Sequence, residues 1–246
     1  ISSGGYNDAG SSSNIIQYVT IASAGNATDF GDLTVARSAT AGCASATRGL
    51  TAGGIGGSNN IIDYITIAST GNATDFGDLT KASYYNTACS NATKGLITAG
   101  TNNATQAVEF VTIATTGNSA DFGDLSVARI FADGFSDSTP SSALEADFAP
   151  AAIGLFGIVL NQTTVEYINI ASLGNSSLFG DASLPRKEHS GGMASTTRAI
   201  AAGGQVGSTE YDTMEYFTFS TKGKATDFGN LSAARYRNTS TSNSTR

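Results

Sequence analysis

Residues 61–83 read IIDYITIASTGNATDFGDLTKAS, and copies of this 23-residue motif occur throughout the chain. The other four copies begin at Ile15, Ala107, Thr164 and Thr213. Successive Phe-Gly pairs of the motif are 46, 46, 57 and 49 residues apart. Self-similarity at a period of about 40–50 residues is typical of a propeller or a solenoid, in which no repeat buries its apolar face alone. The sequence therefore predicts units that stack on one another.

The two ends of the chain together supply one more repeat. The C-terminal stretch 244–246 (STR) matches residues 46–48 (ATR), and the N-terminal stretch 1–6 (ISSGGY) matches residues 49–54 (GLTAGG). A closed ring explains this match, because a blade made from both termini leaves no exposed sheet edge, whereas a solenoid needs polar caps. We predict one domain over residues 1–246: an all-β, five-bladed β-propeller with four-stranded antiparallel blades, closed by a blade shared between the N- and C-termini.

Each repeat is expected to contain four short strands. In the second repeat the first three are expected at 38–46, 49–54 and 61–68, the third with two largely apolar faces. A Gly-Asn corner at 71–72 then leads into a fourth strand that carries DFGDL, because Gly and Asn tolerate positive φ. One aromatic residue of each third strand is expected to wedge between adjacent sheets: Tyr18, Tyr64, Phe110, Tyr167 and Tyr216.

The composition argues against several partners. The chain has 246 residues, a net charge of −7 and only 13% charged residues. Nucleic acids and anionic lipids require basic stripes, so neither is expected as a partner. No apolar run reaches the roughly 20 residues of a membrane helix, so no membrane insertion is expected. The chain begins at Ile1 rather than Met, which indicates a processed, trimmed or partial product.

Cys43 and Cys89 are the only cysteines and occupy the same place in consecutive repeats. We interpret them as two small buried packing residues. The alternative is a disulfide between neighbouring repeats, which is disfavoured because equivalent positions of adjacent blades should lie too far apart to be bridged.

The residues needed for common catalytic sites are scarce. A single histidine, His189, is available for any nucleophilic triad, and two cysteines with one histidine make no metal cluster. The glycine pairs end strands and precede no helix, so no phosphate-binding loop is expected. Only Asp133, Asp137 and Glu188 offer carboxylates near the predicted channel for glycosidase chemistry. We therefore predict a protein that is not an enzyme, with no catalytic residues, cofactor or metal; a carbohydrate-active enzyme is the weakest alternative.

One repeat is longer than the others. If Phe135 matches Cys43, its extra residues fall within 135–152, in the loop between the first and second strands of that repeat. Loops of a rigid scaffold carry variation and function, so we interpret this insertion as a contact loop. Its candidate binding residues are Asp137, Leu144, Glu145, Asp147 and Phe148. The alternative is a neutral elaboration, or a plug that packs its own apolar side chains against the ring.

The repeated corners form a second set of candidate binding residues: Asn26, Asn72, Asn118 and Asn175. Similar corners predict several weak sites, which would bind a glycan multivalently. Three of these asparagines belong to Asn-x-Ser/Thr sequons, so glycan acceptors are an alternative interpretation in a eukaryotic secretory protein. We favour turns without attached glycans, because sequons arise by composition alone in a chain this rich in Asn, Ser and Thr.

The repeat pattern resembles the kelch repeat. The residues that carry the resemblance are Arg37, the pair Gly53-Gly54, Tyr64 and Phe76, where phenylalanine stands in place of the kelch tryptophan. This resemblance implies the blade fold and no particular chemistry. The motif sequence YITIASTGNATDFGDLT also resembles repeats in tail or virion-appendage proteins of marine tailed phages.

The phage resemblance implies a virion structural or host-attachment part. Its expected partners are other virion or appendage subunits, or a cell-surface glycan or receptor, and its expected location is the virion. The alternative is a lectin-like adhesion propeller that is secreted or displayed on a cell surface.

Overall fold

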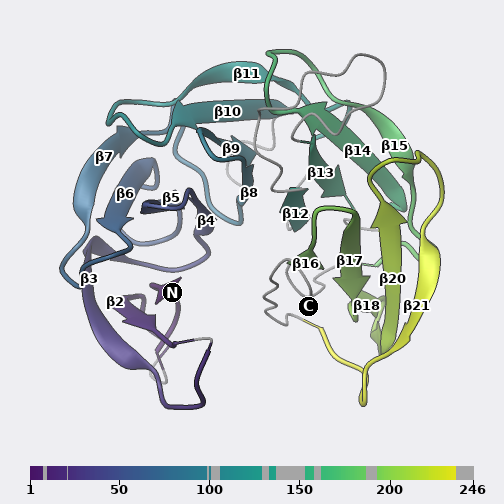
Figure 1. Ribbon diagram of the computed structural model, residues 1–246, viewed down its shortest axis with the longest axis horizontal. Helices are drawn as coiled ribbons and strands as arrows, with labels where there is room; N and C mark the ends of the chain where they lie inside the picture. The colour runs from purple at the N-terminus through teal and green to yellow at the C-terminus, as the bar shows by residue number, and fades with distance from the viewer. Residues whose placement is uncertain are drawn as a thin grey trace.

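The computed structural model describes residues 1–7, 10–20, 22–98, 100, 106–128, 133–136, 153–157, 162–186 and 193–236. Within these ranges the regular structure consists of strands and includes no helix. Accordingly, no described segment is a helix with the length and hydrophobicity to cross a bilayer. The strands form antiparallel sheets that follow one another around an arc (Figure 1). The prediction of an all-β protein is confirmed.

Four sheets in the described part of the chain have four antiparallel strands each, with the outermost strand last in sequence. The second sheet consists of β4 (Ala41–Ala44), β5 (Arg48–Ala52), β6 (Ile61–Thr66) and β7 (Thr74–Asp78). The third consists of β8 (Thr87–Ser90), β9 (Lys94–Thr98), β10 (Ala107–Thr112) and β11 (Ala120–Asp124). The fourth consists of β12 (Asp133–Ser136), β13 (Ile153–Gly157), β14 (Thr164–Asn169) and β15 (Ser177–Asp181). The fifth consists of β16 (Met193–Ala194), β17 (Arg198–Ala202), β20 (Thr213–Thr218) and β21 (Thr226–Asn230).

The first sheet and one hairpin depart from this pattern. The first sheet has three described strands: β1 (Ser2–Ser3), β2 (Ser13–Tyr18) and β3 (Thr28–Arg37). A small hairpin, β18 (Gln205–Val206) with β19 (Thr209–Glu210), lies between β17 and β20 in the sequence and forms a separate two-stranded sheet. The predicted four-stranded architecture therefore holds for the second to fifth sheets, whereas three strands of the first sheet lie within the described residues.

The described residues form an open arc rather than the predicted closed ring (Figure 1). The motif phenylalanine is at most 5% exposed in the first four copies, but Phe228 in the fifth is 48% exposed. We call the edge between β21 and the corner at Gly25-Asn26 the seam. The strand that was predicted to close the ring falls within residues 238–246, which lie outside the described residues.

The segment around the Phe-Gly pair forms a β-bulge in the outermost strand of each of the five sheets, with an aspartate before the phenylalanine in all but the fourth, where Leu178 stands. In the second sheet Ile62 pairs with Gly77 and Asp63 pairs with Asp75, so Phe76 is the extra residue. A bulge bends its strand and re-aims a side chain. Phe76 is accordingly buried, with its ring edge-to-face against Tyr64 at a centroid distance of 6.0 Å.

The aromatic residue of the third strand makes this edge-to-face contact in all five sheets. Each is half-buried and lies edge-to-face against the motif phenylalanine of its own sheet. The hydrophobic core lies in layers between neighbouring sheets: one layer combines Leu50 and Phe76 of the second sheet with Ile97 and Val111 of the third. Similar layers join the first sheet to the second, the third to the fourth and the fourth to the fifth. Each sheet therefore needs a neighbour to bury its apolar faces.

Candidate functional site

The predicted Gly-Asn corners connect the second, third and fourth sheets each to the sheet before it. Gly71 donates its N–H to the carbonyl of Phe30, and Ala73 donates to the carbonyl of Asp32, both at 2.7 Å. The side-chain Oδ1 of Asn72 accepts the N–H of Asp32 at 3.0 Å. Three hydrogen bonds, which we call the corner bonds, thus fix the second sheet to the outer strand of the first.

The corner bonds recur along the arc. Asn118 Oδ1 accepts the N–H of Asp78 at 3.0 Å, and Asn175 Oδ1 accepts the N–H of Asp124 at 3.1 Å. Between the fourth and fifth sheets, where Lys224 replaces the asparagine, the two main-chain bonds remain. Asn26 lies in the first sheet, which has no preceding sheet among the described residues. The exposed corner asparagines therefore have a structural role that the sequence analysis missed.

The glycine of the Phe-Gly pair is required by the close approach of the next corner in the first four motif copies. Gly77 has φ of 144°, and a Cβ on it would lie 2.5 Å from the carbonyl oxygen of Gly117. A Cβ on Gly31 or Gly123 would collide with the next corner in the same way. Gly229, with φ of 128°, has no such neighbour within 4 Å, because it lies at the seam.

A carboxylate of the third strand is buried in each of the second to fifth sheets: Asp63, Glu109, Glu166 and Glu215. Asp63 accepts hydrogen bonds from the Thr34 N–H (3.2 Å) and hydroxyl (2.7 Å) of the preceding sheet. It also accepts from Arg37 Nη2 at 2.7 Å, and both partners of this ion pair are fully buried. Arg37 Nη1 donates to the carbonyls of Gly53 and Ile61 at 2.8 and 2.7 Å. Burial lowers the pKa of Arg37, whereas the charge of Asp63 and its hydrogen bond oppose that shift.

The partner of this carboxylate varies between junctions. Arg186 forms the same buried ion pair with Glu215 and also bonds the carbonyls of Gly203 and Thr213. Glu109 instead accepts from the hydroxyls of Thr80 and Ser119, and Ser83 stands where Arg37 does in the preceding motif copy. The first sheet has an exposed glutamine, Gln17, at the corresponding place. An acidic residue inside an otherwise apolar strand was the available signal, since a buried charge needs a partner.

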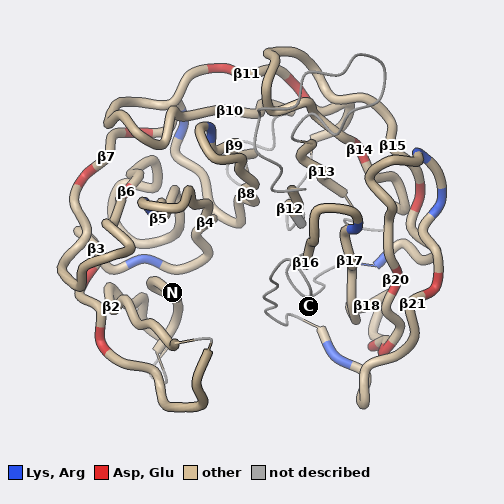
Figure 2. Tube along the Cα trace, in the orientation of Figure 1, with Lys and Arg blue, Asp and Glu red and all other residues tan. Residues whose placement is uncertain are grey.

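Lys and Arg side chains cover the third-strand aromatics. The Arg48 guanidinium carbon lies 4.6 Å from the ring centroid of Tyr64, and that of Arg198 lies 4.3 Å from Tyr216. Such cation–π contacts are worth about 0.5–1 kcal/mol at exposed sites. Lys94 covers Phe110, and Lys222 of the fifth sheet covers Tyr167 of the fourth. Acidic residues lie on the outer strands β7 and β11 (Figure 2), so this part of the outer rim is negatively charged.

Several predicted site residues lie outside the described residues. These are His189, Glu188, Asp137, Leu144, Glu145, Asp147 and Phe148, together with the side chain of Asp133. In the fourth sheet Phe135 pairs with Leu155 as Cys43 pairs with Leu50, so residues 137–152 connect β12 to β13. Over the part of the chain that the structure describes, no three His, Cys, Asp or Glu side chains are grouped to hold a metal ion.

Both cysteines are free thiols that pack between sheets, Cys89 buried and Cys43 partly buried, so the packing interpretation is confirmed, with less burial of Cys43 than expected, and the disulfide alternative is wrong. A Cβ on Gly95 would lie 2.6 Å from Cys43 Sγ, and one on Gly154 would lie 2.6 Å from Cys89 Sγ. Each thiol thus fills the space beside a glycine of the following sheet. Burial raises the pKa of Cys43 to about 12.

We expect Cys43 to be nearly inert in the folded protein. Alkylation requires the thiolate, which is a very small fraction of a thiol with a pKa of about 12 at mildly alkaline pH. Iodoacetamide at about pH 8, followed by mass spectrometry, should modify it at least ~100-fold more slowly in the native protein than in urea. Modification of the native protein at the unfolded rate would contradict the burial of this thiol.

Comparison with known proteins adds no relative. No protein-family model matches the chain, and no curated protein matches it either. The resemblances to kelch repeats and to phage appendage repeats therefore stay predictions from the residues of this sequence.

Proposed function

We propose that this chain is a non-enzymatic structural and binding module of a phage tail fibre or virion appendage, with a role in host attachment. The observation that carries the proposal is that the residues of the repeated motif make the contacts between neighbouring sheets. Its Gly-Asn corner, its Phe-Gly pair and its buried acid all serve contacts between sheets. Because the motif residues hold adjacent sheets together, the motif favours a rigid scaffold that presents variable loops to a partner.

The proposed scaffold is a five-bladed kelch-like β-propeller closed at the seam. Five motif copies and five sheets of three or four strands support the blade number. The seam also carries the residues that form the other junctions, with Gly229 on one edge and Gly25-Asn26 on the other. Ring closure would bury Phe228 and remove the exposed sheet edge.

The proposed contact region is the insertion at residues 137–152, with Asp137, Leu144, Glu145, Asp147 and Phe148 as its binding residues. This segment joins two strands that in the second sheet are joined by residues 45–47 alone. We prefer it to the corners because the Oδ1 atoms of Asn72, Asn118 and Asn175 already accept corner bonds. The proposed partners are other appendage subunits or a cell-surface glycan or receptor.

Shortening the insertion tests this assignment. A variant in which Ser-Ala-Thr, the sequence of residues 45–47, replaces residues 137–152 should keep the melting temperature of the wild type. We expect it to lose at least about tenfold in affinity for bacterial cells or arrayed glycans that the wild type binds, which is about 1.4 kcal/mol. Equal binding by both proteins would move the contact region elsewhere, and no binding by the wild type would argue against the attachment role.

The second candidate is a lectin-like adhesion propeller that is secreted or displayed on a cell surface. One observation favours it. Asn26 and Asn72 are exposed at corners and lie in Asn-x-Thr sequons. N-glycans found by mass spectrometry on either residue of the natural protein would favour this candidate over the virion module.

A further inference from the structure

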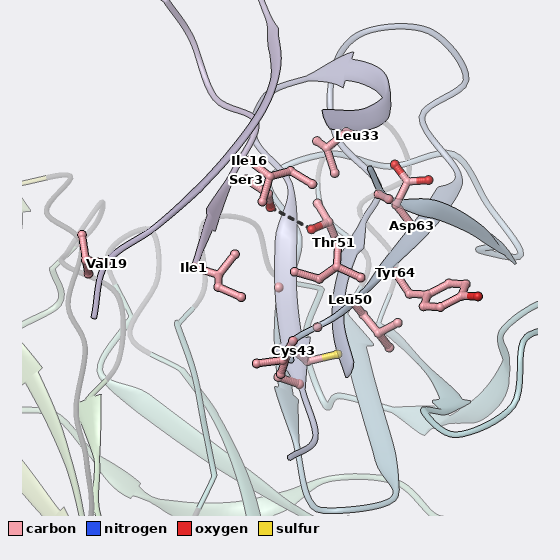
Figure 3. Close-up of a pocket in the computed structure, with 16 residues that line it drawn as sticks. Ile1, Ser3, Ile16, Val19, Leu33, Cys43, Leu50, Thr51, Asp63 and Tyr64 are labelled. Carbon is pink, nitrogen blue, oxygen red and sulfur yellow. Dashed lines mark hydrogen bonds between the residues drawn. The ribbon is translucent and has the colours of Figure 1, made fainter. Parts of the chain in front are cut away.

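Exposed apolar side chains gather at two places on the described part of the chain, where nine large ones are exposed. Six lie in or directly after the two sheets that border the seam: Ile1, Tyr6, Ile15, Val19, Phe228 and Tyr236. Ile1 and Val19 also line a cavity of about 560 Å³ between the first and second sheets (Figure 3). The other three, Val127, Leu173 and Leu178, belong to the third and fourth sheets, and we call them the apolar strip. Sheets lie on both sides of this junction, so the open seam does not explain their exposure.

The two leucines of the apolar strip lie at the two ends of the corner that joins the fourth sheet to the third. Gly174 directly follows Leu173, and Ser176 lies two residues before Leu178. Both donate their N–H groups to carbonyls of β11, at 3.0 and 2.8 Å. Five residues of chain span at most about 18 Å, so the two leucines are close enough to contact one partner.

Val127 lies at the Leu178 end of the strip. Ser126, directly before Val127, donates its N–H to Glu166 at 3.0 Å and its hydroxyl to the same carboxylate. Glu166 is the residue opposite Leu178 in the fourth sheet. The apolar strip therefore follows the junction between the third and fourth sheets.

The other motif copies show that the fold does not require these leucines. The place of Leu178 is taken by an aspartate in each of them: Asp29, Asp75, Asp121 and Asp227. Asp75 and Asp227 accept the N–H of the glycine two residues later, at 3.1 Å. Leu178 has no acceptor to offer and is 62% exposed, and Leu173, 63% exposed, stands where the other copies have Ala, Thr or Lys. Exposed apolar residues grouped in this way are typical of an interaction site.

The charges beside the apolar strip indicate the kind of partner. Asp121 and Asp124 on β11 are exposed (Figure 2), and the main chain of Asp124 bonds to the corner between the two leucines. Lys94 lies at the same junction, but its Nζ is already engaged, 5.4 Å from the ring centroid of Phe110 and 3.5 Å from the carbonyl oxygen of Ala171. Apolar side chains next to free carboxylates complement a partner that carries apolar side chains next to Lys or Arg.

The same charges argue against two other occupants. A second copy would bring the same acidic outer strand and the same net charge of −7, and like charges across an interface repel. An anionic lipid surface would be repelled for the same reason.

We propose that the apolar strip, together with Asp121 and Asp124, is a contact surface for a basic protein segment in which apolar side chains alternate with Lys or Arg. None of its residues belongs to the insertion at residues 137–152. The inference goes beyond the proposed function, since it holds whether or not the insertion binds a receptor and whether or not the ring is closed.

Restoring the residues of the second motif copy tests this surface. The variant Leu173→Thr/Leu178→Asp carries the counterparts of Thr70 and Asp75. Its melting temperature should be no lower than that of the wild type, because the new aspartate can accept the N–H of Gly180. A labelled synthetic peptide of alternating Leu and Lys should bind it at least about tenfold more weakly than the wild type in fluorescence anisotropy. The added carboxylate alone would strengthen binding of a cationic peptide, so the loss reports the apolar contact.

Two matched controls accompany this variant. Val19→Thr removes an exposed apolar side chain of the first sheet and should bind the peptide like the wild type. Asp121→Asn/Asp124→Asn should weaken binding and reduce its dependence on salt. Asp29→Asn/Asp75→Asn removes two exposed carboxylates from other outer strands and should change neither.

Several outcomes would overturn the proposal. The first is no binding of the Leu-Lys peptide by the wild type, or equal binding by Leu173→Thr/Leu178→Asp. Equal binding of a peptide of alternating Leu and Glu would refute a basic partner. A dimer in sedimentation velocity that the variant abolishes would assign the strip to a second copy, and phosphatidylcholine vesicles bound by the wild type alone would assign it to a membrane. No cells or glycans enter these measurements, so their failure leaves the experiment on the insertion standing.

Discussion

Replacing Asp63 by alanine is expected to lower the free energy of unfolding by about 3–5 kcal/mol. The reason is the guanidinium that remains. Arg37 is fully buried, and without Asp63 it keeps only main-chain carbonyls as hydrogen-bond partners. The Thr34 N–H and hydroxyl of the neighbouring sheet lose their acceptor as well. A single substitution thus leaves one unpaired charge and weakens the contact between the first two sheets.

Urea unfolding followed by far-ultraviolet circular dichroism measures this effect, since the chain has no tryptophan. The matched control is Asp29→Ala, which removes an exposed carboxylate from β3 and should change stability by less than about 0.5 kcal/mol. The double variant Arg37→Met/Asp63→Leu should recover most of the loss, because apolar residues of similar volume often replace a buried ion pair without cost. An Asp63→Ala variant as stable as Asp29→Ala would contradict the buried pairing.

The repeat made the strand order of this protein predictable. The motif places apolar residues on both faces of a strand expected over 61–68, and the structure has β6 over Ile61–Thr66, because the chain turns after Thr66. The predicted corner, the fourth strand and the interlayer core all follow from local pattern and turn chemistry. The bulge at Phe76 did not follow, since it depends on pairing across the sheet rather than on sequence spacing.

The contacts between sheets were the harder part. The roles of Asn72 and Gly77 arise from residues of a neighbouring repeat, more than 30 positions away, so no local pattern reveals them. The buried pairing of Asp63 could have been predicted, because a carboxylate between Ile62 and Tyr64, in a strand with two apolar faces, requires a buried partner. For the insertion, the sequence indicates an unusual length, but recognition depends on how its side chains are arranged in space.

Gly77→Ala is expected to lower the free energy of unfolding by about 2–4 kcal/mol, from backbone strain at positive φ and from overpacking. Its Cβ would collide with the carbonyl of Gly117 and push the second and third sheets apart. The control is Gly223→Ala, where φ is 146° but no atom lies within 4 Å of the added Cβ. The control should show the strain alone, so Gly77→Ala should be the more destabilising by about 1–3 kcal/mol. Equal losses would mean that the corner does not approach Gly77 closely.

The same substitution at Gly229 decides whether the seam closes. Gly229 occupies the position of Gly77 in the last motif copy, yet its Cβ would meet nothing in the open arc. If the corner at Gly25-Asn26 packs onto β21, as we propose, Gly229→Ala should cost as much as Gly77→Ala in urea unfolding. A loss no larger than that of Gly223→Ala would leave the arc open.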